Sequence, residues 1–115
     1  MIFKLHEKNG ITIARFIDVN RFTLAICEDV KDELKPLLND KGAKMILDLE
    51  GISFIDSSGI GCVISLVKTA KSNGAFFKIC NLSKEVSSVF ELLHLHMILD
   101  IDKDVESSVS NFSKV

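Results

Sequence analysis

The chain has 115 residues, 47% of them hydrophobic, with one Pro and six Gly, which fits one compact globular domain over residues 1–115 without a second core. Its 14 Lys and Arg against 16 Asp and Glu give a formal net charge of −2, so there is no excess of positive charge for binding nucleic acid or anionic lipid, and we expect protein partners. No apolar run approaches the roughly 20 residues that span a bilayer and the N-terminus lacks a signal-peptide pattern, so we expect a cytoplasmic protein without membrane insertion.

The N-terminal third predicts a β-hairpin followed by a helix. Residues 2–6 and 11–17 have strand-like composition, and Asn9-Gly10 between them is a strong hairpin signal. A helix is expected to start near Thr23 and to kink or end at Pro36, because proline lacks the backbone N–H and clashes with the preceding turn. The apolar stripe that indicates this helix consists of Leu24, Cys27, Val30, Leu34 and Leu37.

The middle of the chain predicts a strand, a helix and a second strand. Residues 45–49 form a short, nearly continuous apolar run, which is typical of a covered strand in a parallel sheet. The next helix should end at Asn73-Gly74, because Gly readily adopts the left-handed conformation of a helix C-terminus. Residues 75–80 indicate the following strand. The helix between the strands is indicated by one apolar stripe of Ile60, Val63, Ile64 and Val67.

The last third predicts two helices separated by a short strand over residues 97–101. Ser83 and Asp102 are the expected N-caps of these helices. The apolar stripes are Val86, Val89, Phe90 and Leu93 in the first helix, and Val105, Val109 and Phe112 in the second. The order ββαβαβαβα predicts an α/β fold with about four helices and a mixed, mostly parallel sheet opened by the N-terminal hairpin. Because polar residues such as Thr12 and Lys78 occur in the strands, we expect the helices mainly on one face or unevenly divided, with part of the sheet facing water.

The stretch Asp56-Ser57-Ser58-Gly59 is the candidate functional site, at the point where the central strand is followed by a helix. The first turn of a helix has backbone N–H groups without partners and the positive end of the helix dipole. A small hydroxyl there can cap the helix or carry a phosphate. The composition alone leaves both interpretations open, including the simpler one in which Asp or Ser caps the helix and does nothing more.

Three segments resemble the STAS domain family, and within it the bacterial anti-sigma factor antagonists: Ile46-Leu47-Asp48-Leu49, Ile55-Asp56-Ser57-Ser58-Gly59-Ile60-Gly61 and, more loosely, Val89-Phe90-Glu91-Leu92-Leu93-His94-Leu95. The resemblance implies a regulatory protein without catalytic activity. It implies that Ser57 is phosphorylated by an anti-sigma factor that is itself a serine kinase of the GHKL type, and that a PP2C-like phosphatase reverses this. The unphosphorylated form would bind the anti-sigma factor and so release the sigma factor.

The same resemblance places the partner-binding surface around the phosphoacceptor, and we expect a monomer. Ser58, one residue further in, is expected to serve the start of the helix instead of accepting phosphate. One segment departs from the family pattern: where many members have a Gly-x-Leu-Asp-like segment, this chain has Asp18-Val19-Asn20-Arg21, with Arg21 where an acidic residue is usual. The partner-binding residues implied by the resemblance are Asp56, Ser57, Ser58, Gly59 and Ile60.

Two other functions stay open as alternatives. The first is a constitutive STAS scaffold, for example the small cytoplasmic subunit of a lipid-transport ABC system. The second, a serine hydrolase, is disfavoured because Ser57 has no Gly two residues before it, as a nucleophile elbow requires. His94 and His96 are expected at a helix end, and no cluster around them completes a metal site, so we expect no metal and no cofactor. The three cysteines, which lack the close pairing of a zinc site, are expected to be reduced and mostly buried: Cys27, Cys62 and Cys80.

Overall fold

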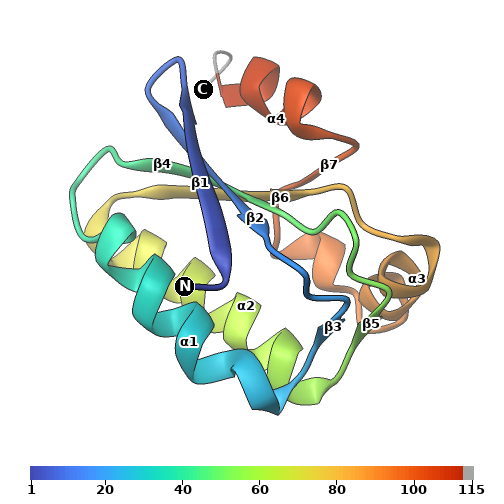
Figure 1. Ribbon diagram of the computed structural model, residues 1–115. Coiled ribbons are helices and arrows are strands. Elements are labelled where there is room, and N and C mark those ends of the chain that lie inside the picture. Colours follow the sequence, from blue (N-terminus) through green and yellow to red (C-terminus); the bar gives the residue numbers. More distant parts are fainter. Residues whose placement is uncertain (113–115) are drawn as a thin grey trace.

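The computed structural model describes residues 1–112, and its main sheet has the strand order β1-β2-β4-β6-β7 (Figure 1). β1 pairs with β2 antiparallel, and every other neighbouring pair in this sheet is parallel. The hairpin turn at Asn9-Gly10 has positive φ angles at both residues, as a tight hairpin requires. The predicted mixed sheet with an antiparallel opening hairpin is therefore confirmed. Its strands are β1 (Phe3–Lys8), β2 (Ile11–Phe16), β4 (Lys44–Asp48), β6 (Phe76–Cys80) and β7 (Ile101–Asp102).

A second, separate sheet was not predicted. It consists of β3 (Arg21–Phe22) and β5 (Phe54–Ile55), which pair in parallel with Arg21 beside Phe54 and Phe22 beside Ile55. Phe22 and Ile55 are buried in the main core, whereas the other pair, Arg21 and Phe54, is exposed. Two residues are too few to show the alternation by which a strand is detected in a sequence.

Four helices cover the main sheet unevenly, as expected. Figure 1 shows α1 and α2 side by side on one face and α4 alone on the opposite face. The main hydrophobic core, which includes residues of α1, α2 and α3, lies on the first face, and a smaller cluster around Phe112 lies beneath α4. The helices are α1 (Leu24–Leu34), α2 (Ser57–Asn73), α3 (Lys84–Leu92) and α4 (Val105–Phe112), with short 3-10 helices η1 (Lys35–Leu38) and η2 (Leu95–Met97).

Most of the predicted helix ends are confirmed, and one is wrong. α1 ends just before Pro36 and continues as η1, Gly74 has the left-handed conformation after α2, and the Ser83 hydroxyl accepts a hydrogen bond from the Val86 N–H at 3.2 Å. Asp102, however, does not cap α4. Asp104 does, because its carboxylate accepts a hydrogen bond from the Ser107 N–H at 2.8 Å.

The short strand predicted over residues 97–101 exists, but it is shifted toward the C-terminus and overlaps the prediction only at Ile101. His94 has a left-handed conformation that ends α3, and the N–H groups of Ile98 and Leu99 are both bonded to the carbonyl of Leu95. These local hydrogen bonds keep the backbone out of the sheet, so β7 begins only at Ile101.

The predicted apolar stripes of the helices pack on the core, but the most deeply buried residues are not always the predicted ones. In α2, Val63 is buried as expected, whereas Ile60, Ile64 and Val67 are half-buried at the flanks of the stripe. Three predicted core positions at helix ends are exposed instead: Leu24, Leu37 and Leu93. The buried residues of α2 are Gly59, Cys62, Val63, Leu66 and Ala70.

Candidate functional site

The carboxylate of Asp56 binds the first residues of two helices. One oxygen accepts a hydrogen bond from the Gly59 N–H at 2.8 Å, which caps α2. The other accepts one from the Leu24 N–H, the first residue of α1, at 3.4 Å. Thr23, the residue before α1, makes no capping bond through its own side chain. The positive ends of two helix dipoles therefore meet at one carboxylate, which is the favourable place for a negative charge.

Gly59 allows α2 to begin directly against β3. A Cβ atom on Gly59 would lie 2.4 Å from the backbone oxygen of Phe22 and 2.8 Å from Cγ1 of Ile55, both far inside van der Waals contact. The same oxygen of Phe22 accepts a hydrogen bond from the Asp56 N–H at 3.2 Å. The second sheet thus fixes the start of α2, and only glycine fits at this position.

The five predicted site residues lie together at the start of α2, and they differ in how far each is exposed to solvent. Ser57 is exposed, Ser58 and Ile60 are half-buried, and Gly59 is buried. Within residues 1–112 the hydroxyl groups of Ser57 and Ser58 make no hydrogen bond. The expectation that Ser58 serves the helix start is therefore wrong, because Asp56 supplies the cap. Ser57 offers a solvent-facing hydroxyl at the first residue of α2.

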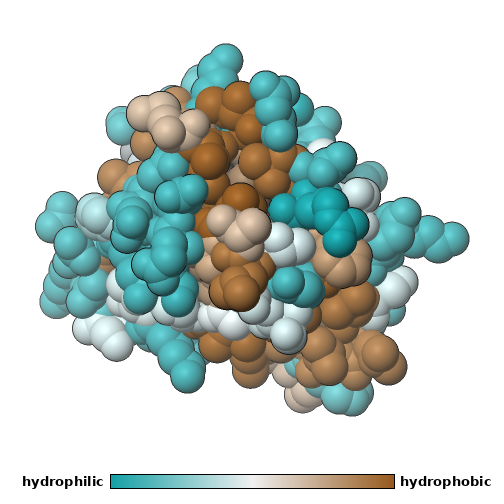
Figure 2. Space-filling model, turned by 60° about the horizontal axis from the view of Figure 1, so that its bottom comes forward, coloured by the Kyte–Doolittle hydropathy of each residue, from teal (hydrophilic) through white to brown (hydrophobic). Residues whose placement is uncertain are grey.

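The surface around Ser57 is partly apolar. Leu24 is 71% exposed and Phe54 is 41% exposed, and the guanidinium carbon of Arg21 lies 4.1 Å from the centre of the Phe54 ring. Figure 2 shows the face of the molecule on which α1 and α2 begin, with hydrophobic areas between hydrophilic ones. Sequence analysis missed Leu24 and Phe54 as surface residues, because each is apolar and Leu24 was assigned to a buried stripe. Arg and aromatic side chains are enriched at protein interfaces.

The sequence model of the STAS domain matches residues 4–108. The chain belongs to the STAS domain family. Over an alignment of 80 residues, this STAS domain is 31% identical to the anti-sigma-B factor antagonist of Bacillus subtilis. The alignment covers 70% of this chain and 72% of that protein.

Two solved structures show the same fold. An anti-sigma-factor antagonist (STAS) domain protein from Planctomyces limnophilus superposes with a TM-score of 0.87 at 18% identity, covering 96% of this chain and 97% of that one. The Bacillus cell fate determinant SpoIIAA in its phosphorylated form superposes with a TM-score of 0.66 at 17% identity, covering 96% and 98%. In the STAS domain described here, no helix within residues 1–112 is long and apolar enough to cross a membrane.

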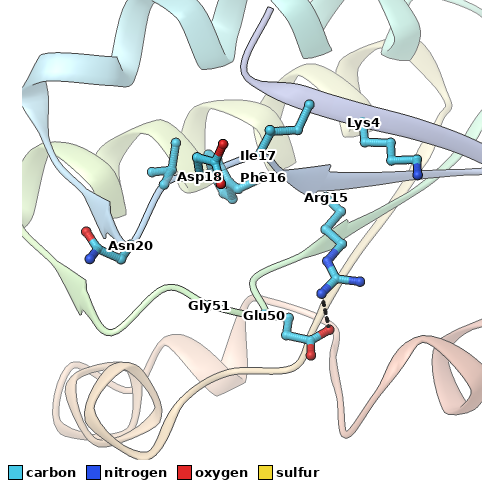
Figure 3. Close-up of a pocket in the computed structure, with 9 residues that line it drawn as sticks. Lys4, Arg15, Phe16, Ile17, Asp18, Asn20, Glu50 and Gly51 are labelled. Carbon is cyan, nitrogen blue, oxygen red and sulfur yellow. Dashed lines mark ion pairs between the residues drawn. The ribbon is translucent and has the colours of Figure 1, made fainter.

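An open hollow of about 670 Å³ lies beside the connection from β2 to β3 in this STAS domain (Figure 3). Figure 3 shows the side chains of Arg15 and Glu50 pointing toward each other, and their ion pair measures 3.1 Å between nitrogen and oxygen. Both side chains are about half exposed, so the pair adds at most about 1 kcal/mol to stability. The hollow contains none of the predicted site residues.

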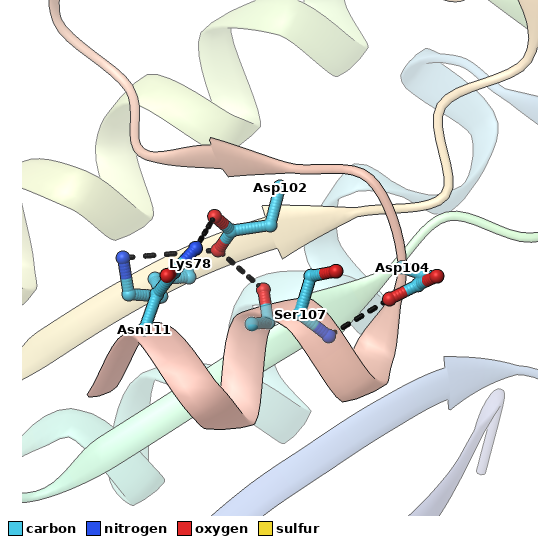
Figure 4. A network of polar contacts seen from close by, with 6 residues as sticks. Lys78, Asp102, Asp104, Ser107 and Asn111 are labelled. Atoms are coloured by element: carbon cyan, nitrogen blue, oxygen red, sulfur yellow. Dashed lines mark hydrogen bonds and ion pairs between the residues drawn. The ribbon is translucent and has the colours of Figure 1, made fainter. Parts of the chain in front are cut away.

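A polar network fastens α4 of the STAS domain to the sheet (Figure 4). The carboxylate of Asp102 accepts hydrogen bonds from the Ser108 hydroxyl and the Asn111 amide, both at 2.6 Å, and lies 3.7 Å from the Lys78 ammonium. The Lys78 ammonium also lies 5.3 Å from the centre of the Phe112 ring. Asp102 is therefore a structural residue that holds α4.

The three cysteines of the STAS domain are buried free thiols, as predicted. Burial raises the pKa of Cys62 to about 12, and the neighbouring Cys27 adds to this shift. Burial also raises the pKa of Cys80 to about 12, with Asp48 as the next cause, and it raises the pKa of Cys27, followed by the charge of Asp56. A high pKa leaves little reactive thiolate at neutral pH. No group of three or more His, Cys, Asp or Glu side chains within residues 1–112 is arranged to bind a metal.

Proposed function

We propose that this STAS domain is a cytoplasmic, monomeric anti-sigma factor antagonist, switched by phosphorylation of Ser57. The unphosphorylated form binds an anti-sigma factor that is a GHKL-type serine kinase and so releases a sigma factor, and a PP2C-like phosphatase restores it. The observation that carries this proposal is the state of Ser57, which is exposed at the first residue of α2 and whose hydroxyl forms no hydrogen bond within residues 1–112. The neighbouring Asp56 accepts one backbone N–H hydrogen bond on each carboxylate oxygen.

The comparisons support this proposal. The relative from Bacillus subtilis is named as an anti-sigma-B factor antagonist, and the match covers 70% of this chain and 72% of that protein. One structural neighbour, SpoIIAA, is known in a phosphorylated form that has the same fold as this chain. A fold that is kept in a phosphorylated relative agrees with a switch that acts locally.

The proposed switch acts through charge at the contact surface. A phosphoserine carries about −1.5 to −2 charges at neutral pH. The start of α2 can accommodate a phosphate without rearrangement of the fold, because its N–H groups and dipole favour anions. Asp56 already makes this spot negative, so a partner surface matched to a neutral hydroxyl meets like-charge repulsion and the cost of desolvating a phosphate. We expect a loss of ~1–3 kcal/mol, roughly ten- to a hundredfold in affinity.

Phosphorylation with a matched control tests the site. The protein is incubated with ATP and each GHKL-type anti-sigma kinase encoded in the same genome, and phosphate is located by mass spectrometry. We expect one phosphate on Ser57 in the unchanged chain and in Ser58→Ala, and none in Ser57→Ala. A full phosphate on Ser57→Ala would refute the assignment of the acceptor.

Binding measurements test the switch. Affinity for the kinase is measured for the unchanged chain, its phosphorylated form and Ser57→Asp, with backbone amide NMR spectra of each. Ser57→Asp should weaken binding less than phosphate, because it adds one charge and fewer acceptor oxygens. Spectral changes should stay near the start of α2. Equal affinities for all three forms would refute the switch and favour a constitutive scaffold, such as a subunit of a lipid-transport ABC system.

A further inference from the structure

Arg21 is held on the outer side of the second sheet, beside Phe54, which lies three residues before the proposed phosphorylation site. In the parallel pairing of β3 with β5, Arg21 lies beside Phe54, and both side chains face outward while Phe22 and Ile55 face the core. The guanidinium carbon lies 4.1 Å from the centre of the Phe54 ring, within the range of a cation–π contact. This contact orients the guanidinium on the surface.

Arg21 forms no ion pair within residues 1–112. Within residues 1–112 two ion pairs form, Arg15 with Glu50 and Lys78 with Asp102, and Arg21 belongs to neither. Arg21 is exposed, so its donors face solvent. An oriented guanidinium loses less conformational entropy when it binds a carboxylate than a freely rotating side chain does.

Hydrogen bonds join the strand of Arg21 to the start of α2. The Phe22 carbonyl, next to Arg21, accepts from the Asp56 N–H, next to Ser57, at 3.2 Å. On the other side of Asp56, the N–H of the exposed Leu24 is held by the Asp56 carboxylate at 3.4 Å. The strand that carries Arg21 and the helix start that carries Ser57 are therefore held together, and a partner surface that extends from Ser57 to Phe54, three residues earlier in the chain, also reaches Arg21.

We propose that Arg21 determines which anti-sigma kinase binds this chain, by receiving a carboxylate of the kinase in the complex. This inference rests on the proposed function. The planar guanidinium offers paired donors that match a carboxylate, and charge-assisted bonds of this kind are among the stronger contacts at interfaces. The Phe54 ring covers one face of the guanidinium and keeps water from that side of the pair. A kinase with a basic or neutral residue at the facing position binds weakly, so the charge of Arg21 selects the partner.

The test uses the kinase that phosphorylates Ser57 in the experiment above and the unphosphorylated chain, with the same measurements on the phosphorylated chain as a comparison. Dissociation constants are measured at two salt concentrations for Arg21→Gln, Arg21→Lys and Phe54→Leu. Lys68→Gln is the matched control, because Lys68 is an exposed cation of α2 that lies eleven residues, roughly 16 Å, beyond Ser57. We expect binding at least about tenfold weaker for Arg21→Gln, an intermediate loss for Arg21→Lys and Phe54→Leu, and less than about twofold for Lys68→Gln.

A charge exchange identifies the facing residue. Arg21→Glu should weaken binding further, and one Asp→Lys or Glu→Lys change on the kinase should restore it. Equal affinities of Arg21→Gln and Lys68→Gln, with an intact complex of the unchanged chain, would overturn the inference and leave the proposed function standing. So would an effect of Arg21→Gln that is confined to the phosphorylated chain, because Arg21 would then neutralise phosphoserine 57 instead of the partner. If the unchanged chain is neither bound nor phosphorylated, the proposed function itself fails.

Discussion

Two glycines of α2 should respond in opposite ways to the same substitution. Gly59 and Gly61 both lie in the first turns of the helix, where alanine normally stabilises a helix by about 0.5–1 kcal/mol. A Cβ atom on Gly61 would meet no atom within 4 Å, so Gly61→Ala should show that gain. A Cβ atom on Gly59 would lie 2.4 Å from the backbone oxygen of Phe22, which cannot move without β3.

The expected size follows from this contact. Extra methyl groups in a closely packed region typically cost about 1–3 kcal/mol, and here the displaced oxygen also accepts the hydrogen bond of the Asp56 N–H. Gly59→Ala should therefore lower the free energy of unfolding by about 1–2 kcal/mol after the gain in helix propensity. The two variants should differ by about 1.5–3 kcal/mol, or roughly 10 °C in Tm for a domain of this size.

Urea and thermal unfolding followed by circular dichroism give this comparison directly, with each alanine variant measured beside the unchanged chain. A Gly59→Ala protein as stable as Gly61→Ala would refute the reasoning, because it would mean that β3 does not press against the start of α2. Gly59→Ala should also weaken kinase binding, because it displaces the strand that carries Arg21.

Three further predictions concern the cap, the core and the thiols. Asp56→Ala should lower the free energy of unfolding by about 1–2 kcal/mol in urea titrations, because two helix starts lose one acceptor, and a neutral result would contradict the double cap. Leu66→Ala should lower the free energy of unfolding by about 2–5 kcal/mol, and Ile64→Ala should lower it clearly less, because Ile64 is only half-buried. Equal unfolding midpoints of the two variants would show that the centre of the buried stripe is not at Leu66. The native thiols should resist iodoacetamide at pH 8 and react after unfolding in urea. Because burial raises the pKa of Cys62 and Cys80 to about 12, the folded state keeps protons that the unfolded state releases above pH 9, so stability should fall from pH 9 toward pH 12, less steeply in Cys80→Ala.

The sequence alone determined the order of the main elements. Local signals were sufficient there, because the Asn9-Gly10 turn, the proline after α1 and the glycine after α2 act through the conformations of single residues. The placement of Ser57 at the first residue of α2 could be predicted for the same reason, since an apolar strand, a capping residue and a helical stripe follow one another directly in the chain.

Only the tertiary structure determined the contacts between distant segments around the site. The pairing of β3 with β5 joins residues 33 positions apart, which brings Arg21 onto Phe54 and presses Phe22 against Gly59. The same pairing makes the Asp56 carboxylate the cap of α1 as well as α2. Such contacts depend on distant segments meeting in space, so neither periodicity nor capping preference indicates them. The position of Ser57 therefore follows from the local sequence, whereas the surface that surrounds it depends on contacts between distant segments.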